Sequence, residues 1–182
     1  MFEGRLNKII VFCIYISVFI NSKTFTEKPV EIYLGYLIFF LLLPIFMLKH
    51  PFPKPLLVIF SILIAAGVLN IFLGNDTTPM FLKICLGVFF SYLFYYYVVV
   101  QSEFNIEKLF QLYLKGCYIV AIIGVFQFVS FLIGFEYGYD FGWILNKWGL
   151  IRGGNFGIRI NSVFGEPTYF AACVSAGAFV AI

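Results

Sequence analysis

The chain has 182 residues and a mass of 20.9 kDa, and 62% of its residues are hydrophobic while only 12% are charged. Soluble domains carry about 25% charged residues to cover their core, so this composition excludes a soluble domain. It also excludes a disordered chain and a small disulfide-stapled domain. The net charge of +3, from twelve Lys and Arg against nine Asp and Glu, provides no basic stripe, and we expect no nucleic-acid partner.

Six apolar runs follow one another along the chain, and they predict an all-α fold, a polytopic bundle of transmembrane helices. A membrane-crossing helix needs about 20 apolar residues, and five runs reach or approach this length. The sixth is still apolar at Ile182, but as a helix it would rise only about 22 Å, short of the roughly 30 Å hydrocarbon core. We therefore expect residues 1–182 to form a single transmembrane region, with five complete spans and a truncated sixth, from the front part of a longer protein. The runs lie near residues 6–20, 32–48, 56–73, 80–100, 116–135 and 168–182.

Lysine and arginine in the loops predict the orientation of the chain. With an inner N-terminus, and with the loop at 136–167 set aside, six of these residues lie inside and three lie outside. The sequence therefore predicts a cytoplasmic N-terminus and an extracytoplasmic, Gly- and aromatic-rich loop at 136–167. Glu103–Lys115 is amphipathic and predicts a separate helix on the cytoplasmic surface. Gln127 lies near the middle of the fifth run, where we expect it to hydrogen-bond to another helix.

The segment from Gly134 to Gly165 differs in composition from the rest of the chain. It holds eight of the sixteen glycines, both tryptophans and two of the three arginines. Glycine at this density indicates backbone that turns tightly or lies close to a ligand. The pattern at Trp143–Ile151 predicts one or two helical turns at the membrane interface. Trp148 fits two roles that the sequence leaves open, an anchor at the headgroup level and a platform for a sugar ring.

Polar groups gather where this segment enters the sixth run, at Arg159, Ser162, Glu166 and Thr168. Glu166-Pro167-Thr168 suits a helix start, because Pro fits the first turn and Glu lies near the positive end of the helix dipole. This interpretation explains Glu166 without a ligand. It does not explain Arg159 and Arg152, whose guanidinium groups pair well with phosphate. Snorkelling of both arginines to anionic headgroups is the alternative.

The stretch Arg-x-x-Ser-x-Phe-x-Glu-Pro-Thr-x-x-Ala at Arg159–Ala171 resembles the motif of the O-antigen polymerase and O-antigen ligase superfamily. It follows several hydrophobic spans and a Gly- and aromatic-rich outer loop, as in that family. The resemblance covers residues 159–171 by sequence and the rest of the chain by hydropathy alone. Family members are typically longer, and their second large outer loop has no counterpart in these residues.

The resemblance implies a membrane glycosyl-transfer enzyme of O-antigen or capsule assembly, in the bacterial cytoplasmic (inner) membrane and active at its outer face. The donor would be a polyprenyl-diphosphate-linked oligosaccharide. Arg159 would neutralise the diphosphate leaving group, and Glu166 would orient or deprotonate the acceptor hydroxyl. Arg152, Ser162 and Trp148 would bind substrate.

The resemblance also implies contacts with membrane lipid and with other polysaccharide-assembly proteins.

We expect no metal and no cofactor, since the four cysteines lie in apolar runs without CxxC spacing or a neighbouring His. Two other functions stay open. One is an O-antigen ligase, and the other is a transporter or flippase of lipid-linked oligosaccharide.

Overall fold

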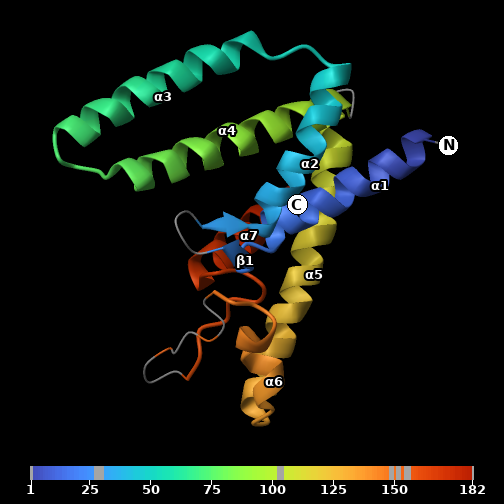
Figure 1. Cartoon of the computed structure of the whole chain (residues 1–182). Coiled ribbons are helices and arrows are strands. Elements are labelled where there is room, and N and C mark those ends of the chain that lie inside the picture. Colours follow the sequence, from blue (N-terminus) through green and yellow to red (C-terminus); the bar gives the residue numbers. More distant parts are fainter. Residues whose placement is uncertain are drawn as a thin grey trace. The chain divides into compact units, whose positions relative to one another are not determined.

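The computed structural model describes residues 2–26, 31–101, 105–147, 150, 153 and 157–181. Most of this part of the chain is α-helical, and two short strands, β1 and β2, pair in a small sheet (Figure 1). The helices are α1 (Phe2–Ile14), α2 (Leu34–Lys49), α3 (Lys54–Phe72), α4 (Thr78–Gln101), α5 (Ile106–Leu132), α6 (Glu136–Tyr139) and α7 (Pro167–Ala181). The remaining elements are the π-helix η1 (Tyr15–Phe19), β1 (Thr24–Thr26), β2 (Ile32–Tyr33) and the 3-10 helix η2 (Phe141–Trp143).

The helical fold class is confirmed, and α3, α4 and α5 are the described helices long and apolar enough to cross a membrane. The runs expected to cross near 6–20 and 32–48 form shorter apolar helices; the first ends with the π-helix η1, and β2 takes the start of the second. The run near 168–182 is the short helix α7. The two strands were not expected from the sequence.

The prediction of a separate surface helix at Glu103–Lys115 is wrong. The described part of this segment belongs to α5, which continues without a break from Ile106 to Leu132. Asn105 caps this helix, since its side chain accepts a hydrogen bond of 2.9 Å from the backbone N–H of Lys108. An amphipathic first turn and an apolar span thus form one helix of 27 residues.

Contacts divide the chain into two compact units. Unit 1 consists of Met1–Thr24, Tyr33–Gly35 and Asn105–Ile182, and unit 2 consists of Phe25–Ile32 and Tyr36–Phe104. In unit 2, α3 and α4 run side by side as a hairpin (Figure 1). The rings of Phe60 and Phe89 lie 4.7 Å apart between these helices, and the rings of Phe39 and Phe94 lie 4.5 Å apart between α2 and α4.

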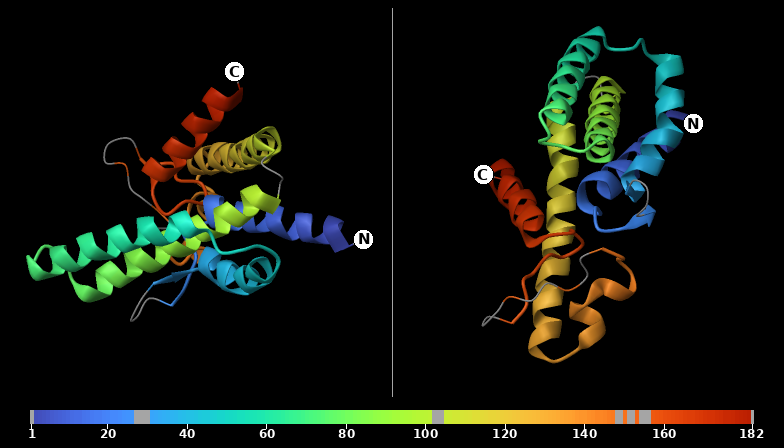
Figure 2. Two further views of the ribbon diagram at one scale, coloured as in Figure 1. Left: turned by 90° about the horizontal axis from the view of Figure 1, so that it is seen from above. Right: turned by 60° about the vertical axis from the view of Figure 1, so that its left-hand side comes forward.

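In unit 1, α7 packs along α5, and α6 folds back on the end of α5 (Figure 2). The core cluster of this unit joins η1, α5, α7 and the segment before α7, through Phe19, Cys117, Val120, Phe164 and Cys173. The close approach of α7 requires Gly177, because a Cβ there would lie 2.7 Å from the sulfur of Cys117.

The long helices α3 and α5 end in the same way. Gly74 and Gly134 follow them with a φ of +74°, a conformation that glycine adopts without steric cost. After α5, the N–H of Gly134 donates to Phe131 and that of Phe135 to Ser130, which is a Schellman motif. This turn starts the segment in which the sequence places the candidate site.

Candidate functional site

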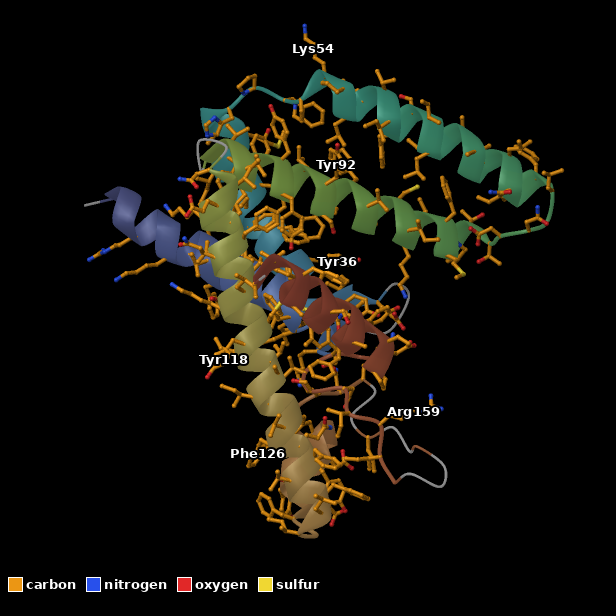
Figure 3. All side chains as sticks on the ribbon, turned by 180° about the vertical axis from the view of Figure 1, so that it is seen from behind. Tyr36, Lys54, Tyr92, Tyr118, Phe126 and Arg159 are labelled. Carbon is orange, nitrogen blue, oxygen red and sulfur yellow. The ribbon has the colours of Figure 1, made fainter. Side chains whose placement is uncertain are left out.

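Helix α5 has two different faces. Its buried residues recur at helical spacing and are small or polar, except for one valine: Gly116, Cys117, Val120, Gly124, Gln127 and Ser130. On its outer face, the rings of Tyr118 and Phe126 are 70% and 51% exposed and project from the helix (Figure 3). An apolar exposed face suits lipid, and small residues on the other face allow backbone to approach closely.

The side chain of Gln127 forms four hydrogen bonds at the centre of the buried face. Its Nε2 donates to the carbonyl of Tyr139 and to Oδ1 of Asn161, both at 3.0 Å. Its Oε1 accepts from the backbone N–H groups of Asn161 at 3.1 Å and Ser162 at 2.9 Å. The amide thereby uses both of its donors and both acceptor positions. The expected hydrogen bond to another helix is present, since Tyr139 ends α6, and the other three bonds hold the segment that precedes α7.

Ser162 lies in the interior of unit 1, with no exposed surface. Its hydroxyl donates to the carbonyl of Val120 at 2.8 Å. Its φ is +52°, a conformation that costs a non-glycine residue on the order of 1–3 kcal/mol and persists only where the surroundings enforce it. Ser162 therefore holds the backbone in place, and it offers no surface to the substrate that the sequence assigned to it.

The residues after η1 hold the other side of this segment. Oδ1 of Asn21 accepts from the N–H of Gly165 at 2.8 Å, and the hydroxyl of Ser22 donates to the carbonyl of Val163 at 2.7 Å. Sequence analysis singled out neither Asn21 nor Ser22, because a polar pair at the end of a short apolar run looks like an ordinary loop. We call residues 157–166, held between α5 and Asn21-Ser22, the motif loop.

The motif loop lies along a helix that is long enough to cross a membrane. Val120, the partner of Ser162, precedes the end of α5 at Leu132 by twelve residues, which is about 18 Å of helix. Irregular backbone at such a depth is tolerated only when protein covers it or when it lines a wet cavity. The side chain of Gln127 covers this backbone and accepts hydrogen bonds from two of its N–H groups.

Arg159 and Glu166 lie on either side of the buried part of the loop, and both are exposed. Figure 3 shows the side chain of Arg159 extending away from the ribbon. Within the described residues, Arg159 forms no hydrogen bond and no ion pair, with Glu166 or any other group. A guanidinium has five donors, and none of those of Arg159 is used by a described residue, so they can bind an anion.

Glu166 starts α7. Its carbonyl accepts from the N–H groups of Tyr169 at 3.2 Å and Phe170 at 3.3 Å, and its carboxylate accepts from the hydroxyl of Thr168 at 3.2 Å. These contacts fit the helix-start interpretation of Glu166-Pro167-Thr168. They leave the exposed carboxylate with further acceptor positions, so a second role in binding is compatible with the cap.

Two other predicted site residues, Arg152 and Trp148, lie outside the described residues. Trp143 is 65% exposed, and its indole N–H donates to the carbonyl of Tyr137 at 3.2 Å. The helical turns predicted at Trp143–Ile151 are not found in the described part of that range; Trp143 instead ends η2, which Asp140 caps by accepting from the N–H of Gly142.

An apolar groove of about 510 Å³ lies in unit 1. Its walls come from α5, η2 and the residues flanking the β1–β2 hairpin, and every lining residue except Lys23 is apolar. The ammonium of Lys23 donates to the carbonyl of Ile144 at 3.0 Å, so the cation lies at the groove. Neither Arg159 nor Glu166 lines it.

No group of three or more His, Cys, Asp or Glu side chains among the described residues is arranged to hold a metal ion. Comparisons of the chain with known protein families, with characterised proteins and with solved structures found no match.

Proposed function

We propose that this protein is a glycosyl-transfer enzyme of surface-polysaccharide assembly that polymerises lipid-linked oligosaccharide units at the outer face of the bacterial cytoplasmic membrane. The observation that carries the proposal is Arg159, an exposed guanidinium that has no partner among the described residues, on a loop that α5 and Asn21-Ser22 hold in place. The resemblance of Arg159–Ala171 to the O-antigen polymerase and ligase motif gives the cation a substrate, the diphosphate of a polyprenyl-linked donor.

In the proposed reaction an acceptor hydroxyl attacks the anomeric carbon of the donor sugar. The new glycosidic C–O bond forms while the bond to the diphosphate breaks, and polyprenyl diphosphate leaves with the electron pair. Arg159 stabilises the negative charge that develops on this leaving group. The hydroxyl proton passes to a carboxylate, for which Glu166 is the exposed candidate on the same loop.

The rival function as a transporter or flippase predicts paired charges at mid-membrane depth or broken helices with matching halves. Among the described residues of α5, the deep polar group is Gln127, and its four hydrogen bonds leave it no capacity for a solute. The exposed polar groups lie instead on the motif loop, which favours catalysis there.

Replacement of Arg159 tests the proposal, with polymer yield in the host normalised to membrane-inserted protein as the measurement. Arg159→Lys keeps the charge but loses the bidentate fork, and Arg159→Ala loses both. Loss of one charge-assisted contact predicts a roughly 10- to 150-fold slower transfer at normal protein abundance. Arg5→Lys, at an exposed arginine of α1, is the matched control and should keep the wild-type yield. A wild-type yield from Arg159→Lys would reduce Arg159 to a headgroup anchor and contradict the proposal.

Topology provides a second test, since the donor is consumed on the outer face. Tyr137 is 69% exposed directly after α5, and in a background without the four native cysteines a Tyr137→Cys variant should react with an impermeant maleimide in intact cells. Labelling only after lysis would place this end of α5 inside and overturn the mechanism.

Gene deletion distinguishes the polymerase from the ligase. Loss of a polymerase should abolish long surface chains and leave single repeat units attached. Loss of all surface units, with long lipid-linked chains accumulating, would identify a ligase instead.

A further inference from the structure

The groove in unit 1 is lined by neither Arg159 nor Glu166, and it has the chemistry of a lipid site. Ile123 and Phe126 of α5 form one wall, Trp143 and Ile144 form another, and Val163 contributes from the motif loop. Its volume of about 510 Å³ falls within the range of roughly 300–1,000 Å³ that small-molecule sites occupy. Because its apolar side chains bind a polar ligand poorly, the occupant is an apolar chain.

The rim of the groove is apolar and open. Phe126, Trp143 and Ile144 are each about half exposed or more. Such a surface is costly in water, whereas α5, to which Phe126 belongs, is long and apolar enough to lie in a bilayer. Lipid chains can therefore enter the groove from the side. Most of the chains in a bilayer are the acyl chains of phospholipids.

Charge selects which phospholipid binds. The ammonium of Lys23 lies at the groove, where its described partner is a neutral carbonyl, Ile144 O, and it has three donors in total. Lys147 supplies a second cation nearby, because its Nζ donates to the hydroxyl of Tyr33 at 3.1 Å, next to the lining residue Leu34. No carboxylate is among the described residues that line the groove. The positive charges of Lys23 and Lys147 favour an anionic headgroup at this side of the groove.

We propose that this groove binds one acyl chain of an anionic phospholipid, with the phosphate at Lys23 and Lys147. The site is separate from Arg159 and Glu166 and does not depend on the proposed enzymatic function. A bound chain would cover Trp143 of η2 and Phe126 of α5 and thereby join these two helices.

The two tryptophans of the chain make the proposal measurable. Trp148→Phe leaves Trp143 as the single fluorophore, and Trp143 lines the groove. The protein is reconstituted in phosphatidylcholine vesicles that contain increasing fractions of phosphatidylglycerol with brominated chains, which quench indole fluorescence on contact. The reverse experiment places bromine on phosphatidylcholine and leaves phosphatidylglycerol unlabelled.

Each lysine near a membrane surface favours an anionic lipid by about fivefold. We therefore expect phosphatidylglycerol to quench Trp143 with an apparent preference of fivefold or more over phosphatidylcholine. Lys23→Gln should lower this preference by about fivefold, and Lys147→Gln should lower it in the same direction. Lys115→Gln, at an exposed lysine of α5 that does not line the groove, is the matched control and should not change it.

A second variant tests the groove independently of charge. Val163→Phe fills the groove from the motif loop and should reduce quenching by both brominated lipids, with the helical circular dichroism unchanged. Equal quenching by the two lipids in the wild-type background would overturn the proposal. Displacement of the brominated phospholipid by a small molar fraction of polyprenyl phosphate would also overturn it, and would assign the groove to an isoprenoid lipid.

Discussion

The two units of this protein use polar groups in opposite ways. In unit 2, only 6% of the apolar window of α3 is buried, and the rings of Phe60 and Phe89 pack between α3 and α4. Unit 1 buries a network of amide and hydroxyl groups between α5 and the motif loop. The difference follows from the backbone that each unit contains. The helices of a hairpin hydrogen-bond their own backbone groups, whereas a non-helical loop beside a long helix needs partners for its N–H and C=O groups.

One pair of tyrosines illustrates the contrast. In unit 1 the hydroxyl of Tyr113 donates to the carbonyl of Cys173 at 2.9 Å and so joins α5 to α7. In unit 2 the hydroxyl of Tyr97 is buried without a hydrogen-bond partner among the described residues, and its ring stacks on that of Phe46. For these two tyrosines, a hydrogen bond joins two helices of unit 1, whereas ring packing surrounds the hydroxyl in unit 2. The following substitutions test this distinction through the free energy of unfolding in mixed micelles.

Gln127→Leu should have the largest effect. It removes four hydrogen bonds and leaves the buried N–H groups of Asn161 and Ser162 unsatisfied, which should cost on the order of 3–5 kcal/mol. Gln111→Leu is the matched control, because Gln111 is an exposed glutamine of the same helix, and it should change stability by less than about 0.5 kcal/mol.

The same variant should release the motif loop. In a background without native cysteines, Ser162→Cys is protected from maleimide because residue 162 is fully buried. Addition of Gln127→Leu should make it react at least tenfold faster. An unchanged labelling rate would mean that the amide of Gln127 does not hold the loop.

Gly177→Val tests the approach of α7 to α5. The new side chain would overlap the sulfur of Cys117, and overpacking of this kind costs about 1–3 kcal/mol. Ala176→Val introduces the same branched residue at the exposed neighbouring position and should be close to neutral. Equal effects of the two substitutions would refute the close packing of these helices.

The two tyrosines should respond differently to the loss of a hydroxyl. Tyr113→Phe should cost about 1 kcal/mol, since it removes the hydrogen bond to Cys173. Tyr97→Phe should be neutral or stabilising, because the buried hydroxyl that it removes bonds to none of the described residues. If Tyr97→Phe were the more destabilising of the two, the contrast between the units would be wrong.

The ion pair of unit 2 should matter least. Lys83 pairs with Glu31, and both side chains are partly exposed, so screening by solvent limits the contribution to about 0.2–1 kcal/mol. A double-mutant cycle with Lys83→Gln and Glu31→Gln isolates this coupling. Elevated salt should weaken it further, and a coupling above about 2 kcal/mol would show that the pair is shielded from solvent.

Several features of the fold follow from the sequence because they depend on neighbouring residues. The sequence predicted the cores of α3 and α4 to within two residues at each end, because the apolar runs are long and uninterrupted. The prediction failed at Glu103–Lys115, where charged residues suggested a break although Asn105 caps a helix that continues into the apolar run. It also missed β1 and β2, which are only three and two residues long.

The roles that the sequence assigned to the candidate site residues stay predictions. Arg159 and Glu166 are exposed, as substrate-contacting residues must be, but Ser162 is buried under the backbone of α5. Asn161 drew no attention from its sequence context, although its side chain bonds to both Gln127 and the carbonyl of Phe164. A polar residue looks the same in a sequence whether it faces substrate or fixes the loop that presents the substrate-binding groups.

The sequence by itself determined that this is a predominantly helical membrane protein and where its unusual segment lies, because hydropathy and glycine content are sums over consecutive residues. Only the tertiary structure decided what holds that segment. Gln127 meets residues 34 and 35 positions away, and Asn21 meets Gly165 across 144 positions. A buried amide or hydroxyl needs a partner wherever the fold brings one, so its role depends on distant backbone that no local pattern describes.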